Sequence, residues 1–118
     1  MEKIIPNKLE ETEFFKEHGN LVEFFDNCCQ EHNGKMAFES FGVEISYEDL
    51  SEKVNAFASW LTNNFQAGDR IAVMMPNMLA YPIIVYGALK AGIIVVNVNP
   101  LYTPRELEHV LKDSEARV

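Results

Sequence analysis

Two adjacent cysteines and a histidine three positions later are the first group in this chain that could do more than pack. Cys28, Cys29 and His32 offer thiol and imidazole groups, which bind zinc or take part in thiol redox chemistry. Neighbouring residues of a helix point about 100° apart, however, and no further cysteine follows. We interpret the group as core packing, because free cysteine usually acts as a small buried hydrophobe.

The other groups with acid, base or nucleophilic chemistry have no partner in sequence. His18 and His109 lie in separate segments, and the carboxylates of Glu106 and Glu108 belong to a polar helix exposed to water. The sequence contains no glycine-rich phosphate loop, no histidine pair with metal spacing and no serine elbow. We therefore assign no catalytic residue and no metal ligand in this chain.

Asn77 allows two interpretations because it follows a short apolar run, residues 70–75. Strand ends in open α/β sheets face the ligand crevice, so Asn77 could contact a ligand. Asparagine also strongly favours the N-cap of a helix, and we prefer this interpretation. Such a helix would place Pro82 beyond its first turn, so it either begins near Pro82 or bends there.

The stretch from Gly68 to Val98 predicts a strand, a crossover helix and a second strand. Residues 70–75 and 93–98 are apolar without polar alternation, which indicates two strands with both faces covered. The helix between them ends at Gly92, and its small residues Gly87 and Ala91 are expected to face the sheet. So short a crossover predicts a parallel pair and an α/β fold.

Helices and a hairpin are expected around this unit. Three capping patterns, Asn20 with Glu23, Ser46 with Asp49 and Thr103 with Glu106, predict three helix starts. The first helix carries an apolar stripe, and the members of that stripe are Leu21, Phe24, Phe25, Cys28 and His32. Residues 36–46 read as a short hairpin around Gly42 that adds an antiparallel edge to the sheet. Residues 116–118 read as the start of another strand, so we expect the chain to be a fragment.

Composition excludes several classes of partner. The chain has 118 residues, 47% of them hydrophobic, and a net charge of -8, which opposes an electrostatic surface for nucleic acid. Adjacent cysteines are poorly suited to an intradomain disulfide, which favours the reducing cytoplasm. No apolar run reaches the ~20 residues of a membrane helix, while peripheral contact with the inner face of a membrane stays open.

The runs GDRIAVMMPN and YGALKAGIIVVNVNPLYTPRELEHVLKDSEA resemble the N-terminal part of long-chain fatty-acid:CoA ligases, which are acyl-adenylate-forming (AMP-binding) enzymes. ISYEDLSEKVNAFASWL resembles the helix before the GDR turn of the same family. The resemblance implies a truncated N-terminal subdomain of the adenylate-forming fold, a small parallel sheet flanked by helices with a short hairpin. Residues 1–19 would be an N-terminal arm, and residues 20–118 the first part of the AMP-binding domain.

The resemblance also implies cofactors and partners for the intact enzyme. Such enzymes use ATP and Mg²⁺ to form an acyl-adenylate and then transfer the acyl group to coenzyme A. The family's phosphate loop, magnesium ligand and adenylation lysine have no counterpart in this sequence, so the chain alone is expected to be inactive. In some relatives the loop matching residues 99–105 lies near the coenzyme A entrance, which makes Arg105 a candidate phosphate contact; a structural salt bridge is the alternative. Ser114-Glu115 replaces the usual Ser-Gly of relatives.

Oligomeric state follows from the same resemblance. Related ligases are often dimers through their N-terminal regions, so a homodimer is expected. Phe14 and Phe15 of the arm could reach a second subunit, although packing on the same chain is the preferred interpretation. The alternative to the ligase is a self-contained α/β interaction or oligomerisation module without catalytic activity.

Overall fold

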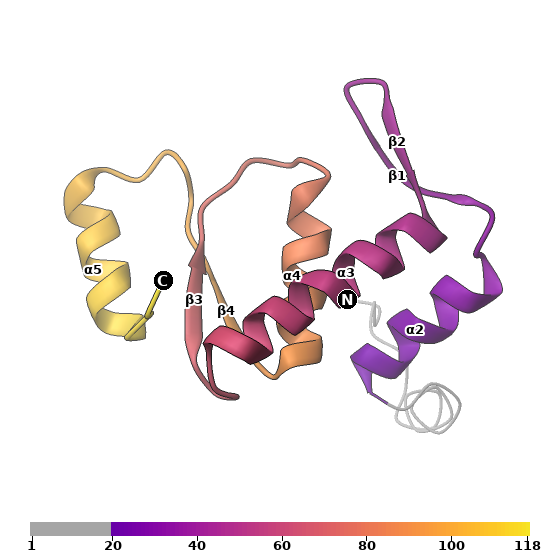
Figure 1. The fold of residues 1–118 in the computed structure, drawn as a ribbon. Helices are drawn as coiled ribbons and strands as arrows, with labels where there is room; N and C mark the ends of the chain where they lie inside the picture. Colours follow the sequence, from indigo (N-terminus) through magenta and orange to yellow (C-terminus); the bar gives the residue numbers. More distant parts are fainter. Residues whose placement is uncertain (1–19) are drawn as a thin grey trace, which may run out of the picture.

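The computed structural model describes residues 20–118, which form two small sheets and four helices (Figure 1). The expected arm, residues 1–19, lies outside the described residues. In chain order the elements are α2 (Leu21–Glu31), β1 (Met36–Ser40), β2 (Val43–Ser46), α3 (Tyr47–Asn64), β3 (Arg70–Val73), α4 (Ala80–Ala91), β4 (Ile94–Asn97) and α5 (Pro104–Ser114).

The predicted strand, helix, strand unit is confirmed. β3 and β4 pair in parallel, with Ile71 opposite Val95, and α4 is the crossover between them. Gly92 ends α4 at φ 73°, a left-handed conformation that glycine adopts without a steric penalty. The next residue, Ile93, donates its backbone N–H to Ala88 and is buried, so the chain turns directly from the helix into the sheet.

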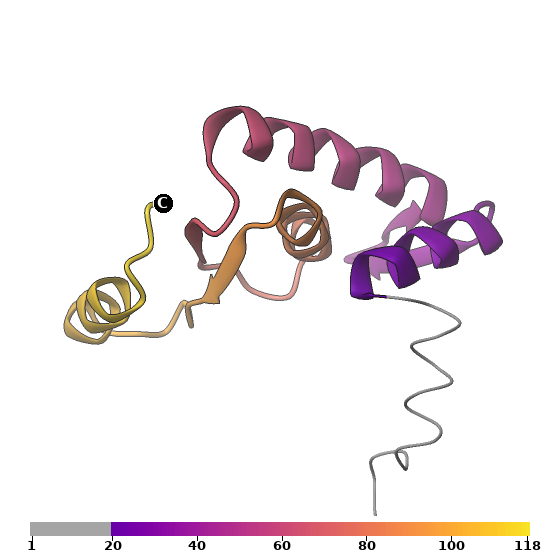
Figure 2. The same ribbon diagram turned by 90° about the horizontal axis from the view of Figure 1, so that it is seen from below.

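The expectation that both faces of the parallel pair are covered is wrong for one face. Ile71 and Val73 are buried beneath α3 and α4, whereas Ile94 is 47% exposed. Figure 2 shows α5 on the side of the strands away from α3 and α4. None of the residues of α5 is buried, so this helix does not close the outer face.

The orientation predicted for Gly87 is also wrong, because Gly87 faces α3 and not the sheet. A Cβ built on Gly87 would lie 2.6 Å from Cδ1 of Phe57 and 3.3 Å from the backbone oxygen of Val54. The neighbouring Ala88, fully buried, and Ala91 pack with the residues that cover the sheet. The apolar surface of α4 extends round most of the helix, so periodicity could not indicate which part meets which neighbour.

Two adjoining cores result from this arrangement. One joins α2, the hairpin and the first half of α3, and its buried members are Phe25, Cys29, Ile45, Leu50 and Val54. The other joins the end of α3 to α4 and the parallel pair, through Leu61, Ile71, Val73, Ala88 and Ile93. The ring of Phe25 stacks on that of Tyr86 at 4.2 Å, so α4 contributes to both cores.

The hairpin forms as predicted but does not extend the parallel sheet. β1 and β2 make a separate antiparallel sheet, with Phe41 and Gly42 at positive φ in the two-residue turn. Ile45 is buried in the core with α2 and α3, and Ser46 caps α3 directly. The hairpin is therefore fixed to the helices, on the far side of α4 from the strands (Figure 1).

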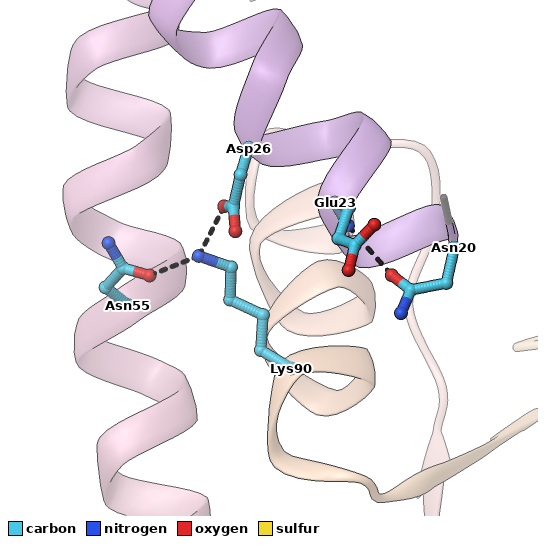
Figure 3. Close-up of polar contacts among 5 residues, drawn as sticks. All are labelled: Asn20, Glu23, Asp26, Asn55 and Lys90. Atoms are coloured by element: carbon cyan, nitrogen blue, oxygen red, sulfur yellow. Dashed lines mark hydrogen bonds and ion pairs between the residues drawn. The ribbon is translucent and has the colours of Figure 1, made fainter. Parts of the chain in front are cut away.

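The three predicted helix caps are confirmed. The side chains of Asn20, Ser46 and Thr103 accept hydrogen bonds from backbone N–H groups three residues later, at 2.9, 3.1 and 3.3 Å. Each bond satisfies an N–H that has no partner within its helix. Figure 3 shows the first of these caps, in which Glu23 lies over Asn20 at the start of α2.

The C-terminal end pairs with β3. Arg117 donates its backbone N–H to Arg70, and Val118 accepts from Ala72. Residues 116–118, where a strand was expected, do not form a regular strand, but their backbone makes these two hydrogen bonds with β3. Glu115 ends α5 at φ 57°, a left-handed conformation at the position where the resemblance leads us to expect glycine.

A polar contact between three helices completes the packing. The ammonium Nζ of Lys90 in α4 lies 2.6 Å from Oδ1 of Asp26 in α2 and 2.6 Å from Oδ1 of Asn55 in α3 (Figure 3). The Lys90 side chain is 16% exposed, so water screens this contact less than it screens a surface ion pair. It holds α2 against the α3 and α4 pair.

Within residues 20–118, no helix has the length and apolar character to cross a bilayer.

We expect Gly87→Leu to lower the free energy of unfolding by about 1 to 3 kcal/mol, because the new side chain must displace Phe57 from a tightly packed contact. Urea denaturation followed by far-UV circular dichroism measures the change. Gly34→Leu is the matched control, since a Cβ at Gly34 has no atom within 4 Å. Equal urea midpoints for the two variants would contradict the close approach of α3 and α4.

A double-mutant cycle with Lys90→Met and Asp26→Asn should give a coupling energy of about 1 kcal/mol, because the pair is partly shielded from water. The control cycle uses Lys112 and Glu108 of α5, which are 2.7 Å apart but 76% and 63% exposed. That pair should couple by less than about 0.5 kcal/mol. Thermal or urea unfolding of the four variants in each cycle provides both values, and the reverse order would refute the role given to Lys90.

Candidate functional site

A cavity of about 380 Å³ opens where the two parallel strands end. The carboxyl ends of neighbouring parallel strands meet at one edge of a sheet, which is where open α/β sheets bind their ligands. Its lining comes from the ends of β3 and β4, the loops that follow them and the start of α4. We call it the strand-end cavity, and its polar lining residues are Asn77, Tyr81, Asn97, Asn99 and Tyr102.

Asn77 lies in this cavity and is not a helix cap, contrary to the preferred prediction. α4 begins at Ala80, and Leu79 at its N-cap position makes no side-chain capping bond. Pro82 is thereby the third residue of the helix, within the first turn, where its missing N–H costs nothing. The helix therefore starts later than a cap at Asn77 would allow, which frees the Asn77 side chain for the cavity.

Hydrogen bonds fix three other lining residues of the strand-end cavity, Tyr81, Asn97 and Asn99. Tyr81 donates its hydroxyl to Oδ1 of Asn97 at 2.6 Å, which ties the first turn of α4 to the end of β4. Oδ1 of Asn99 accepts from the backbone N–H of Leu101 at 2.9 Å and holds the loop in a turn. Sequence reasoning missed Tyr81, since only the tertiary fold brings it to Asn97, 16 residues away.

A second cavity, of about 260 Å³, lies between the hairpin and the loop before α4. We call it the hairpin cavity; its lining includes Phe38, Leu79 and Pro82, and it shares Asn77 and Tyr81 with the strand-end cavity. Glu39 is the one charged side chain along its lining as the structure describes it. The two cavities thus adjoin at the loop and first turn of α4.

The strand-end cavity is lined by amides, phenols and apolar groups and by no charged side chain. Amides and phenols can position a ligand through hydrogen bonds, and each offers both a donor and an acceptor. They are poor general acids or bases near neutral pH, because the phenol pKa is about 10 and the amide does not titrate. The arrangement is suited to binding and orientation.

The cysteines pack as predicted, but the buried side of α2 includes Cys29 and not Cys28 of the predicted stripe. Cys29 is the buried thiol, at 4% exposure, while Cys28 is partly exposed, so the buried face of α2 is centred on Phe25 and Cys29. Burial raises the pKa of the Cys29 thiol, and the Asp26 carboxylate adds to the rise. The ring of His32 lies against that of Tyr47, 5.7 Å away. Across the described range 20–118, no three His, Cys, Asp or Glu side chains could share a metal ion.

Arg105 lies on the exposed surface in the first turn of α5, three residues after Tyr102. It is not part of the strand-end cavity lining, although Tyr102 and Pro100 of the same loop are. It also forms no ion pair within the described part of the chain. The structural salt bridge that was the alternative for Arg105 is therefore absent from residues 20–118, and a phosphate contact stays a prediction.

Comparison with known proteins identifies relatives along most of the chain. The AMP-binding enzyme family matches residues 25–118. The long-chain-fatty-acid–CoA ligase of Yersinia pestis is 50% identical over 101 residues, 84% of this chain and 18% of the ligase. The 4-hydroxybenzoate–CoA/benzoate–CoA ligase of Rhodopseudomonas palustris is 30% identical over 105 residues, 87% of this chain and 20% of that protein. The chain thus spans about a fifth of the length of these relatives.

Solved structures agree in fold. The N-terminal subdomain of Klebsiella oxytoca NpsA superposes with a TM-score of 0.78 at 28% identity, covering 82% of this chain and 26% of that one. VinN in complex with L-aspartate gives a TM-score of 0.78 at 30% identity, with 85% and 29% covered. The predicted fold, the N-terminal subdomain of adenylate-forming enzymes, is confirmed. This chain belongs to the AMP-binding enzyme family.

Proposed function

We propose that this chain is the N-terminal portion of a long-chain fatty-acid:CoA ligase. The observation that carries the proposal is the identity of about 50% to ligases of this specificity, from Yersinia pestis and from Haemophilus influenzae, over more than four fifths of the chain. The benzoate-type ligase is 30% identical over a similar span, which favours a fatty-acid substrate. The alternative, a self-contained interaction module, gives no reason for the chain to be more similar to fatty-acid ligases than to the benzoate-type ligase.

In the intact enzyme the reaction has two steps. The fatty-acid carboxylate attacks the α-phosphorus of ATP, forming an acyl-adenylate and releasing pyrophosphate. The thiolate of coenzyme A then attacks the acyl carbon and AMP leaves, which gives the acyl-CoA thioester. Adenylation is needed because a free carboxylate resists nucleophiles, whereas the mixed anhydride has a good leaving group.

The residues described here do not fit a triphosphate with its magnesium ion. The strand-end cavity has no cationic side chain to pair with phosphate and no carboxylate to bind Mg²⁺. Their part is to form the framework that supports the catalytic residues of the longer protein. Arg105, exposed beside the loop at residues 99–103, is the candidate contact for a phosphate of coenzyme A.

Location and assembly complete the proposal. The ligase works in the cytoplasm, where free cysteines stay reduced, with peripheral contact to the inner face of the membrane. It is a homodimer, and the half-buried Leu107 and the exposed Leu111 of α5, together with the half-exposed Ile94 of β4, support association.

A chimera tests the proposed activity. The segment of the Yersinia pestis ligase that matches this chain is replaced by the present sequence, and acyl-CoA formation is measured with a long-chain fatty acid, ATP, Mg²⁺ and coenzyme A. We expect a kcat within about tenfold of the parent enzyme, because the framework is equivalent.

Two controls accompany the chimera. The 118-residue chain alone is the baseline and should release no pyrophosphate, because it has no phosphate loop of the family pattern. A chimera with the matching segment of the Rhodopseudomonas palustris ligase should be less active, in line with its lower identity. A folded chimera at the baseline would refute the proposed function.

Self-association is tested by sedimentation equilibrium of the 118-residue chain over a range of micromolar concentrations. We expect a concentration-dependent dimer, because the exposed edge of β4 and the apolar side of α5 favour association. Deletion of residues 1–19 shows whether the arm takes part. A monomer at every concentration would refute the dimer, and a dimer that survives the deletion would refute only the role of the arm.

A further inference from the structure

The turn between α2 and β1 contains Asn33 followed by Gly34, the one asparagine–glycine pair in the sequence. Lys35 donates its backbone N–H to the carbonyl oxygen of His32 at 2.8 Å, so Asn33 and Gly34 are the two central residues of a β-turn. Both residues are exposed. Water therefore reaches the side-chain amide of Asn33 and the peptide bond that follows it.

An asparagine can react with the backbone nitrogen of the residue after it, and the structure leaves the groups of this turn free to do so. The N–H of Gly34 makes no hydrogen bond to another residue of the described chain, and neither does the side chain of Asn33. Gly34 has no Cβ to hinder its nitrogen. The space beside it is open as well, since a Cβ built on Gly34 has no atom within 4 Å.

Other asparagines of the described chain lack these features. Three of them hold their side chains in hydrogen bonds to other residues, and these are Asn20, Asn55 and Asn97. Asn63 is exposed, but it lies inside α3, where the helix holds the backbone. Asn77 is also exposed, but methionine follows it, and its side chain crowds the backbone nitrogen. Asn33 is thus set apart by both its neighbour and its surroundings.

We propose that Asn33 is a site of spontaneous deamidation, which converts it to aspartate and isoaspartate. The nitrogen of Gly34 gives its proton to hydroxide and forms a bond to Cγ of Asn33. The side-chain nitrogen takes a proton from water, which regenerates the hydroxide, and leaves as ammonia. Water then opens the cyclic imide: attack at Cγ gives aspartate, whereas attack at the backbone carbonyl carbon routes the chain through Cβ and Cγ and gives isoaspartate.

The turn that changes in this reaction also caps α3. The backbone oxygen of Asn33 accepts the N–H of Glu48 at 3.2 Å, and that of Lys35 accepts the N–H of Tyr47 at 3.0 Å. Both N–H groups belong to the first turn of α3, where the helix itself offers them no carbonyl. Aspartate leaves the backbone as it is and keeps these bonds. Isoaspartate adds a methylene group to the backbone and displaces the carbonyl group that Glu48 needs.

Both products also bring a negative charge to this surface. Asn33 lines a cavity of about 410 Å³ together with the carboxylates of Asp26, Glu48 and Glu52, and Lys90 is the one cationic side chain of that lining. The added charge is the same for aspartate and isoaspartate. A comparison of the two products therefore isolates the effect of the altered backbone.

Mass spectrometry tests the chemistry on the folded 118-residue chain, incubated at pH 8.5. Deamidation adds about 1 Da to the peptide that contains the residue, and a protein-isoaspartate methyltransferase with labelled S-adenosylmethionine counts the isoaspartate. We expect Asn33 to react at least ~10-fold faster than Asn63 or Asn77. Gly34→Ala is the matched variant and should slow the reaction of Asn33 at least ~10-fold, because its Cβ hinders the nitrogen but meets no neighbour in the fold. Circular dichroism verifies that the variant is folded.

Hydrogen exchange tests the consequence for α3. The incubated chain, in which isoaspartate accumulates, is compared with Asn33→Asp, which has the same charge and an unaltered backbone. We expect the amide protons of Tyr47 and Glu48 to exchange faster in the isoaspartate form than in Asn33→Asp. Incubated Gly34→Ala should exchange at these two positions as it does before incubation.

Two results would overturn the proposed site: reaction of Asn33 no faster than that of Asn63 and Asn77, or a rate that Gly34→Ala leaves unchanged. Equal exchange of Tyr47 and Glu48 in the isoaspartate form and in Asn33→Asp would overturn the link to the cap of α3. The reaction needs only water, and it is independent of ATP, fatty acid and coenzyme A. Its outcome therefore leaves the chimera test of the ligase unaffected.

Discussion

The close approach of α3 and α4 at Gly87 is the constraint on which the rest of this structure depends. Only a residue without a Cβ allows Phe57 and the backbone of Val54 to come so near. That approach brings Ala88, one position along, against the parallel strands and presses Tyr86 onto Phe25. A single glycine thus sets the distance between the helices and, through them, joins the two cores.

The same placement of α4 creates the strand-end cavity. Because α4 lies between the hairpin and the strands, its first turn carries Tyr81 to the end of β4, where the hydroxyl meets Asn97. The late start of the helix at Ala80 leaves the preceding loop open, and Asn77 turns into the space. A helix capped at Asn77 would have filled that space with its own first turn.

Local signals in the sequence predicted where the helices and strands begin and end. They did not predict which surfaces of these elements pack against one another. The caps at Ser46 and Thr103 and the end of α4 at Gly92 depend on residues within one turn, so spacing alone identifies them. The face of Gly87 and the placement of the hairpin depend on which apolar surfaces meet, and α4 is apolar on nearly every side. Tyr81 and Asn97 gave no signal, since neither a motif nor a periodicity links residues 16 apart.

Family membership in this chain is carried by residues that shape the backbone rather than by residues that react. Three residues in the segments that resemble the ligases set the backbone geometry. Gly92 ends α4 and Gly68 forms a turn, both at positive φ, and Pro104 occupies the first position of α5. At Glu115, where the resemblance leads us to expect glycine, the backbone has the left-handed conformation. Proteins named for fatty-acid and for benzoate substrates both match this chain, in agreement with a segment that supplies geometry and no reacting group.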